Sequence, residues 1–242
     1  MTDNAWFGVT PEPVAKYVHP PTNSSYNPLS PFHISRQMLT LLPPLSQIAW
    51  EMTEVPAKKT TIVDLFAGAG GNSIAFALSE RWTRVIAVEK DKATLACAQN
   101  NAAVYGVAEY ITWVHGDVFE FMSLARNDPS SLHPDLRFDP ETSVAFASPP
   151  WGGPGYTTDQ VFNLHAMEPY NLAQLHEACA HMDHALFLPR SSDLRQIAAL
   201  MPTGKQAEVV QYCVEGASKA LVAHIPARGS AKPTFYYHTG DD

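Results

Sequence analysis

The sequence predicts an α/β fold built on a mostly parallel, seven-stranded sheet that ends in an antiparallel hairpin. From Thr60 onward, short apolar runs alternate with segments of helical pattern, which is typical of a parallel sheet covered by helices on both faces. The first apolar run leads into a glycine-rich turn. The last two expected strands are joined by a short segment at residues 215–218, so one of them must run antiparallel to its neighbour. With 242 residues, 45% of them hydrophobic, the chain can bury one such core.

Seven apolar runs are the expected strands of this sheet, at residues 61–66, 84–89, 110–114, 144–148, 185–188, 208–214 and 220–225. Helices are expected after Gly71, Asp91, Pro169 and Ser191. Residues 127–142 contain three prolines and several charges, which predicts a surface insertion before the fourth strand. Residues 56–226 are therefore expected to form one domain.

The chain before this domain has a different character. Residues 1–55 are rich in proline and aromatic side chains and predict a small helical and loop extension. One helix is expected to begin with Thr10 as N-cap and Pro11 at its first position, and another is expected over residues 34–42. Residues 227–242 are expected to form a C-terminal tail.

The composition narrows the class of protein. No apolar run approaches the roughly 20 residues that span a bilayer, and the first residues lack a secretory pattern, so we expect a soluble intracellular protein. The three cysteines lie far apart, which argues against a disulfide framework and against a metal site. The formal net charge of −8 disfavours long duplex DNA as a substrate, and a small, locally recognised end of an RNA fits better. We expect Lys16, Lys58 and Lys59 to be solvated.

A cofactor site is predicted where the first expected strand meets the glycine-rich turn, in residues 62–72. Glycines at Gly68 and Gly70 let the backbone approach a ligand closely. Glu89 ends the second strand 21 residues after Gly68, where a carboxylate can accept both hydroxyls of a ribose. Asp117 follows the third strand and is either a further ligand or the N-cap of a helix.

The acid at the end of the first strand decides which cofactor is expected. Asp64 would repel the pyrophosphate of a nicotinamide dinucleotide, but it favours a ligand that carries an amino acid and a sulfonium. The sequence therefore predicts S-adenosylmethionine as the cofactor and a class I, Rossmann-like methyltransferase fold. The expected cofactor contacts are Thr10, Asp64, Phe66, Ala67, Gly68, Gly70, Asn72, Glu89, Asp117 and Val118.

The fourth expected strand leads into Ser148, Pro149, Pro150 and Trp151, a motif that resembles those of methyltransferases acting on planar amino groups. An exocyclic amine is a poor nucleophile, so its hydrogens must be held by acceptors and its nitrogen aimed at the methyl group. The Ser148 hydroxyl and the Pro149 carbonyl can be these acceptors, and paired prolines stiffen them. Trp151 offers a stacking platform, and its strong affinity for cations indicates a positively charged base.

Several segments together resemble the trimethylguanosine synthase family, in their order along the chain and in their spacing. They are residues 6–12, 63–72, 100–106, 148–154 and 188–190. The resemblance implies the transfer of two methyl groups to N2 of the 7-methylguanosine cap of small nuclear and nucleolar RNAs. It also implies proteins of small ribonucleoproteins as further partners, and action in the nucleus and nucleolus and also in the cytoplasm.

The resemblance also implies roles for individual residues. Asp64, Glu89 and Asp117 would hold the cofactor, with Thr10 and Asn72 near its amino-acid end. Catalysis would involve Ser148, Pro149 and Trp151. The capped substrate would be bound by Ser148, Pro150, Trp151, Tyr156 and Arg190, with Trp151 on the base and the last two on the phosphates.

Two other hypotheses remain open at this stage. The chain could methylate another exocyclic amine, N2 of guanine or N6 of adenine, in ribosomal RNA, transfer RNA or DNA. Such enzymes more often carry Asn or Asp before the two prolines and Tyr or Phe after them, so Ser148 and Trp151 count against this hypothesis. The chain could also be an inactive RNA-binding relative, which intact acids at Asp64, Glu89 and Asp117 disfavour.

Overall fold

The computed structural model describes residues 48–49, 52, 55–152, 161–201, 207–214 and 217–229. The helices expected after Thr10 and over residues 34–42, and most of the C-terminal tail, lie outside these residues. The division into 1–55, 56–226 and 227–242 therefore stays a prediction.

Seven strands form one sheet in the order β3-β2-β1-β4-β5-β7-β6. Strands β1 to β5 pair in parallel, and β7 lies between β5 and β6 and is antiparallel to both. The predicted α/β fold with its closing hairpin is confirmed. The strands are β1 (Thr61–Asp64), β2 (Arg84–Glu89), β3 (Ile111–His115), β4 (Ser143–Ala147), β5 (Asp183–Pro189), β6 (Glu208–Val214) and β7 (Ala217–Ile225).

Of the five α-helices whose bounds lie in the described residues, four begin close to where the sequence predicts them: α3 (Gly71–Leu78), α4 (Lys92–Val104), α6 (Leu172–Cys179) and α7 (Leu194–Ala198). The sequence interpretation omitted the fifth, α5 (Val118–Asn127). Asp117 is its N-cap and accepts hydrogen bonds from the backbone N–H groups of Phe119 and Glu120. Short 3-10 helices span Ala108–Tyr110, Pro129–Ser131, Pro134–Leu136, Pro140–Thr142 and Leu164–Ala166.

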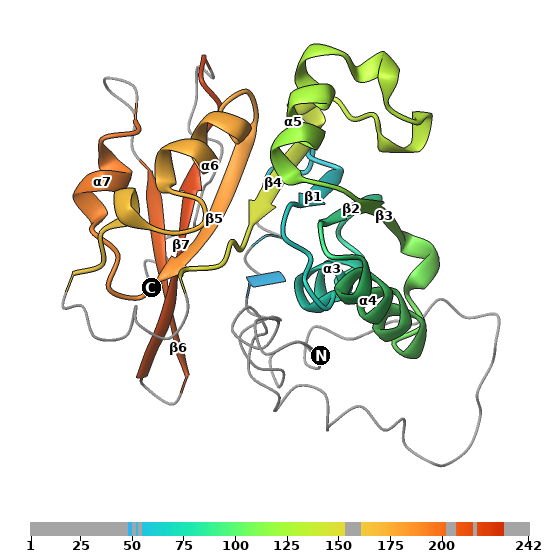
Figure 1. Ribbon diagram of the computed structural model, residues 1–242, viewed down its shortest axis with the longest axis horizontal. Helices are drawn as coiled ribbons and strands as arrows, with labels where there is room; N and C mark the ends of the chain where they lie inside the picture. The colour runs from blue at the N-terminus through green and yellow to red at the C-terminus, as the bar shows by residue number, and fades with distance from the viewer. Residues whose placement is uncertain are drawn as a thin grey trace.

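Helices lie on both sides of the sheet, as Figure 1 shows. One core cluster joins side chains of α5, α6 and α7 to one face of the central strands, among them Phe121, Leu175 and Ile197. The other cluster contains Ile74 and Phe76 of α3 together with apolar side chains from the opposite face. Both faces of the central strands are therefore covered, which explains why these strands are apolar throughout.

The segment predicted as a surface insertion, residues 127–142, is only partly a surface feature. Its three short helices are largely exposed, but Leu132 is buried in the core, and Leu136 and Phe138 pack against it. Arg84 of β2 donates hydrogen bonds to the backbone carbonyls of Asp135 and Arg137. These contacts hold the segment against the domain.

In the described part of the chain, no helix combines the length and apolar character needed to cross a bilayer. The same residues contain no group of three or more His, Cys, Asp or Glu side chains able to hold a metal ion.

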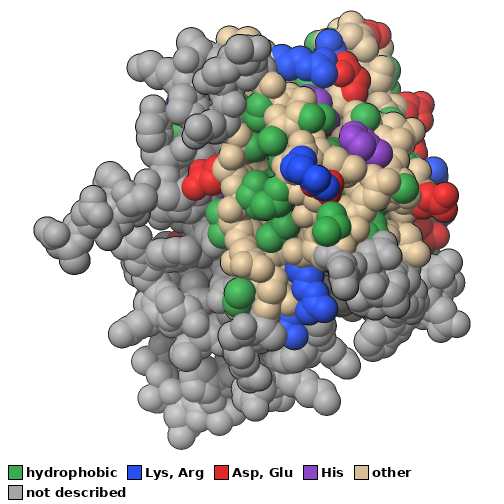
Figure 2. All heavy atoms as spheres, turned by 90° about the vertical axis from the view of Figure 1, so that its left-hand side faces the viewer, with side chains coloured by type: hydrophobic (Ala, Val, Ile, Leu, Met, Phe, Trp, Pro, Cys, Tyr) green, Lys and Arg blue, Asp and Glu red, His purple; other side chains and the backbone are tan. Residues whose placement is uncertain are grey.

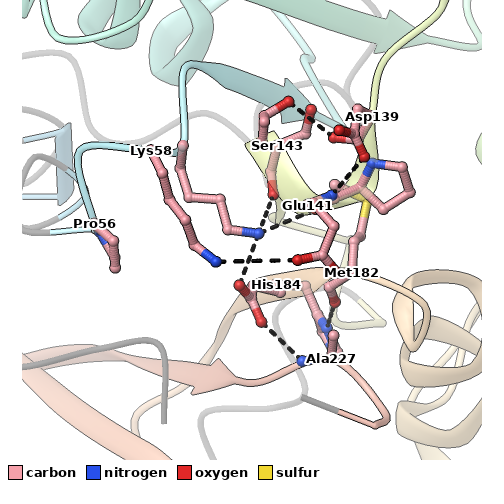
Figure 3. A network of polar contacts seen from close by, with 12 residues as sticks. Pro56, Lys58, Asp139, Glu141, Ser143, Met182, His184 and Ala227 are labelled. Carbon is pink, nitrogen blue, oxygen red and sulfur yellow. Dashed lines mark hydrogen bonds and ion pairs between the residues drawn. The ribbon is translucent and has the colours of Figure 1, made fainter. Parts of the chain in front are cut away.

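A buried ion pair ties four segments together at the amino ends of the parallel strands. Lys59, expected to be solvated, is 2% exposed, and its Nζ lies 2.8 Å from Oδ2 of Asp183, which is 3% exposed. The same ammonium donates to the carbonyls of Pro140 and Ser143, and Asp183 Oδ1 accepts from the Ala227 N–H. Figure 3 shows this network between Ser143 and Ala227. All three ammonium protons are therefore used inside the protein, and Lys59 is not a candidate for binding RNA.

Replacing Lys59 by Met should lower the free energy of unfolding by about 3–5 kcal/mol, because Asp183 would keep an uncompensated charge in the interior. The double variant Lys59→Met/Asp183→Asn should recover much of this loss, since it leaves no buried charge. Urea unfolding of the wild type, of Lys59→Met and of the double variant measures both effects. A loss below about 1 kcal/mol in Lys59→Met would contradict the buried ion pair.

Candidate active site

The candidate site lies at the carboxyl ends of β1 and β4, the neighbouring strands where the direction of the sheet order changes. From β1 the chain proceeds outward to β2 and β3, whereas β4 and β5 lie on the other side of β1. Open α/β sheets bind ligands at the carboxyl ends of the strands at such a point. The predicted cofactor and substrate segments follow these two strands directly.

The turn after β1 is shaped by two glycines in the left-handed region. Gly68 has φ 54°, and Gly70 has φ 91° as the N-cap of α3. A Cβ on Gly70 would lie only 3.1 Å from the Ala98 Cβ, whereas a Cβ on Gly68 would meet nothing within 4 Å. Asn101 of α4 holds the turn by donating to the Ala69 carbonyl over 2.9 Å. The turn is therefore fixed by α4 on one side and open above Gly68.

Asp64 is fully buried at the end of β1. Its Oδ2 accepts a 2.6 Å hydrogen bond from the Ser73 hydroxyl, while Oδ1 has no hydrogen-bond partner among the described residues. Burial raises the pKa of Asp64 to about 6, although the hydrogen bond from Ser73 opposes this shift. A buried carboxylate with an unpaired oxygen is poorly stabilised in the free protein, and a ligand ammonium would supply the missing partner.

Glu89 ends β2 and leans over the glycine turn. Its Oε2 accepts from the Gly68 N–H at 2.9 Å, and its Oε1 accepts from the Asp91 N–H at 2.7 Å. Each carboxylate oxygen still has a lone pair, so the fixed carboxylate can accept two ribose hydroxyls. This arrangement fits the predicted role of Glu89.

Asp117 already makes structural contacts, and its predicted contact with the cofactor would have to exist beside them. Its Oδ1 caps α5, and its Oδ2 lies 3.2 Å from the Lys90 ammonium. Burial acts to raise the pKa of Asp117, but the hydrogen bonds from Lys90 and from the α5 backbone outweigh it and lower the pKa. Val118 is buried in the core, so its backbone rather than its side chain is suited to a ligand. The cofactor contacts of both residues stay predictions.

An aromatic group lies beside the glycine turn, and the sequence interpretation missed two of its members. The Tyr170 ring lies 5.7 Å from the ring of Phe66 and 4.9 Å from that of Phe119. Phe119 belongs to the first turn of α5, and Tyr170 lies about a hundred residues beyond Phe66 in the chain. Since no local pattern connects such distant positions, only the fold brings these rings together. Ala67, also a predicted contact, is buried, and its N–H donates to the Val88 carbonyl.

The substrate motif begins beside the cofactor turn. The Ser148 hydroxyl donates to the Phe66 carbonyl over 3.4 Å and accepts from Nδ2 of Asn72 over 3.3 Å. Pro149 is buried and Pro150 is exposed. Ser148, predicted to hold the substrate amine, is thus in direct contact with two residues predicted to hold the cofactor.

Trp151 lies at the same edge, half-buried. Its indole N–H donates to the Phe187 carbonyl of β5 over 3.2 Å, and the two rings lie 5.3 Å apart at 34°. These contacts fix the orientation of the indole at the carboxyl end of the sheet. A fixed ring at this position is suited to stacking, but its contact with a base stays a prediction, and Thr10 and Tyr156 lie outside the described residues.

Arg190 follows β5 and is exposed, and its Nη1 donates to the Ser218 carbonyl over 3.3 Å. Because Pro189 pairs with Ala220 in the antiparallel register, the next pair brings Lys219 opposite Arg190. Lys219 is also exposed and was not among the predicted site residues. The hairpin pattern in the sequence could have suggested it, but only with the strand register known.

The sheet order, the open glycine turn and the carboxylates at the ends of β1 and β2 define a class I S-adenosylmethionine-dependent methyltransferase. Residues 59–228 match the family described as RNA cap guanine-N2 methyltransferase. The chain belongs to this family.

Two relatives support the assignment. The trimethylguanosine synthase of Schizosaccharomyces pombe is 32% identical over 173 residues, which cover 70% of this chain and 66% of the relative. The trimethylguanosine synthase of Saccharomyces cerevisiae is 26% identical over 201 residues, covering 82% of this chain and 50% of the relative. The chain therefore spans no more than about two-thirds of the first relative and half of the second.

Among solved structures, an RNA methyltransferase from Salinibacter ruber in complex with S-adenosyl-L-homocysteine shares 16% identity with this chain. The likeness covers 79% of this chain and 96% of that one, with a TM-score of 0.45.

Proposed function

We propose that this protein methylates N2 of the 7-methylguanosine cap of RNA and produces 2,2,7-trimethylguanosine. The observation that carries this proposal is the contact between the substrate motif and the cofactor turn, where Ser148 meets Phe66 and Asn72. An amine held at Ser148 would lie directly beside the group that supplies the methyl. The family membership and the relatives support the same reaction.

In this proposal, S-adenosylmethionine, when bound, supplies an electrophilic methyl group on a sulfonium. The Ser148 hydroxyl and the Pro149 carbonyl accept the N–H groups of the substrate and aim the nitrogen lone pair at that methyl. Asp64 and Glu89 would hold the methyl donor beside that nitrogen, and the proton lost from the nitrogen on methylation would pass to water. Positioning therefore does most of the work, and no strong base is required.

Specificity for the cap is proposed to come from Trp151, which contacts the base, and from the basic side chains of Arg190 and Lys219, which contact the phosphates. The cationic 7-methylguanine ring stacks on the indole, where it gains a cation–π contribution that a neutral guanine lacks. Arg190, Lys219 and Tyr156 bind the phosphates that follow the base. Arginine suits this role because its guanidinium can contact a phosphate through two N–H groups.

The distribution of charge fits recognition of a short end of RNA. Figure 2 shows that, on the described part of the face at the β6–β7 end, Lys and Arg side chains form a few small groups separated by hydrophobic and other surface, with acidic side chains beside some of them. With a net charge of −8, the chain is poorly suited to a long phosphate backbone. We propose small nuclear and nucleolar RNAs as substrates, proteins of their ribonucleoproteins as partners, and the nucleus, including the nucleolus, as the place of action.

A methyl-transfer assay tests the proposed function. With saturating labelled S-adenosylmethionine, a 7-methylguanosine cap dinucleotide should be methylated at least about tenfold faster than its unmethylated counterpart, because the second lacks the cation. Equal rates would favour a general guanine methyltransferase. No transfer to either dinucleotide, from a protein that still binds S-adenosylhomocysteine, would favour the inactive RNA-binding relative.

A further inference from the structure

We propose that Asn72 is a positioning residue that couples the two ligand sites: its amide oxygen binds the ammonium of the cofactor, while its amide N–H fixes the Ser148 hydroxyl as an acceptor for the substrate amine. This inference rests on the proposed function for its second half. Its first half concerns the cofactor alone and can be tested without any substrate.

The hydrogen-bond capacity of Ser148 sets the orientation of both side chains. A hydroxyl has one proton and two lone pairs, and a backbone carbonyl can only accept. The Ser148 proton therefore goes to the Phe66 carbonyl, so the Asn72 group that faces the hydroxyl must be its NH2. One lone pair of Ser148 remains. The hydroxyl can then accept from an N–H, but it has no proton left to donate.

The carbonyl oxygen of the Asn72 amide, Oδ1, is buried and receives no hydrogen bond from the described residues. Asp64 Oδ1 is buried and unpaired in the same way, and Ser73, the next residue after Asn72, donates to the second oxygen of Asp64. Two unpaired acceptors thus lie at the end of β1 and in the first turn of α3, where the cofactor's amino-acid end is expected.

These two acceptors call for a donor with several protons. An ammonium has three, and buried acceptors without partners are strongly disfavoured in the free protein. Binding of the cofactor ammonium would fix the Asn72 amide and, through its NH2 group, the free lone pair of Ser148. Cofactor should therefore strengthen substrate binding, and substrate should strengthen cofactor binding by the same factor.

The first experiment uses calorimetric titration with S-adenosylhomocysteine and with 5′-methylthioadenosine, which lacks the amino-acid end. Asn72→Ala should lower the affinity for S-adenosylhomocysteine about tenfold or more and leave the affinity for 5′-methylthioadenosine nearly unchanged. Ser148→Ala should also lower the affinity for S-adenosylhomocysteine more than that for 5′-methylthioadenosine, but by a smaller factor than Asn72→Ala does. Ser148 itself does not contact the cofactor in this proposal. If both variants bind the two ligands as the wild type does, the inference is wrong whatever the substrate is.

The second experiment measures the affinity of a 7-methylguanosine cap dinucleotide with and without saturating S-adenosylhomocysteine. In the wild type the cofactor product should improve cap affinity about fivefold or more. In Asn72→Ala and in Ser148→Ala, S-adenosylhomocysteine should no longer improve cap affinity. The double variant should behave in the same way as each single variant.

Asn101→Ala is the matched control, because Asn101 holds the glycine turn without touching Ser148. Asn101→Ala should lower the affinity for S-adenosylhomocysteine, but the cofactor product should still improve cap affinity by the same factor as in the wild type. An improvement that survives in Asn72→Ala would make Asn72 a cofactor ligand only and overturn the coupling. Absence of cap binding in the wild type, with the selectivity of the first experiment intact, would instead contradict the proposed function.

Discussion

Asp64→Asn should lower the affinity for S-adenosylhomocysteine at least about a hundredfold, because it removes the buried charge proposed to hold the cofactor ammonium. Asparagine matches aspartate in size, so the apolar strand β1 that carries it should remain intact. Calorimetric titration measures the loss, and Asp128→Asn is a control that changes an exposed carboxylate on another segment. Unchanged affinity in Asp64→Asn would mean that the glycine turn and Asp64 are only structural.

The raised pKa of Asp64 adds a pH dependence to this prediction. Only the ionised carboxylate attracts an ammonium, so with a pKa of about 6 the wild type should bind S-adenosylhomocysteine about tenfold more weakly at pH 5 than at pH 7.5. Asp64→Asn should lack this dependence. A wild-type affinity that is flat between pH 5 and 7.5 would contradict an ionised Asp64 in the complex.

The same shift affects the stability of the free protein with the opposite sign. Because folding raises the pKa of Asp64 from 3.8 to about 6, its contribution to stability is fully present below pH 3.8 and is lost as the pH rises through 6. Cofactor binding compensates for this loss. The thermal shift caused by S-adenosylhomocysteine should therefore be larger at pH 7.5 than at pH 5.

Trp151→Ala should weaken binding of a 7-methylguanosine cap dinucleotide by about 1–3 kcal/mol, because the base loses its stacking platform. Methyl transfer should also slow, since the amine is no longer held in line. Trp151→Phe should recover part of the loss, because a smaller ring still stacks but attracts a cation less strongly. Titration of each variant with the cap dinucleotide measures these effects.

The contacts of Trp151 with Phe187 require two controls for this prediction. S-adenosylhomocysteine affinity should change little, because the cofactor residues Asp64 and Glu89 do not depend on the indole. A thermal melt should show that the domain is still folded. If Trp151→Ala unfolds the protein or weakens both ligands equally, the indole is a structural part of the sheet edge and the proposed cap site is wrong.

Local patterns in the sequence were sufficient to predict the strands. Apolar runs fixed β1 to β7 to within a few residues, and the short separation between the last two runs predicted their antiparallel pairing. These features depend on neighbours in the chain. The omission of α5 shows the limit, since Asp117 was considered both as a ligand and as an N-cap while the helix that it caps was left out.

Features that depend on distant residues could not be predicted in the same way. Lys59 looked like a solvated surface lysine, but the fold places it against Asp183, more than a hundred residues away. Tyr170 and Lys219 join the site only through the packing of α5 and the register of β7. The sequence did predict a cofactor segment after the first strand and a substrate segment after the fourth, but it gave no indication of the hydrogen bonds from Asn72 to Ser148 and from Ser148 to Phe66.

The methyl group is proposed to reach N2 of the cap guanosine, and analysis of the product tests this position most directly. The protein is incubated with 7-methylguanosine-capped RNA and isotopically labelled S-adenosylmethionine, and the RNA is digested to nucleosides for mass spectrometry. We predict label in 2,7-dimethylguanosine and 2,2,7-trimethylguanosine and none in adenosine or in internal guanosine. Label in an internal nucleoside, or an unlabelled cap beside another labelled base, would contradict the assignment.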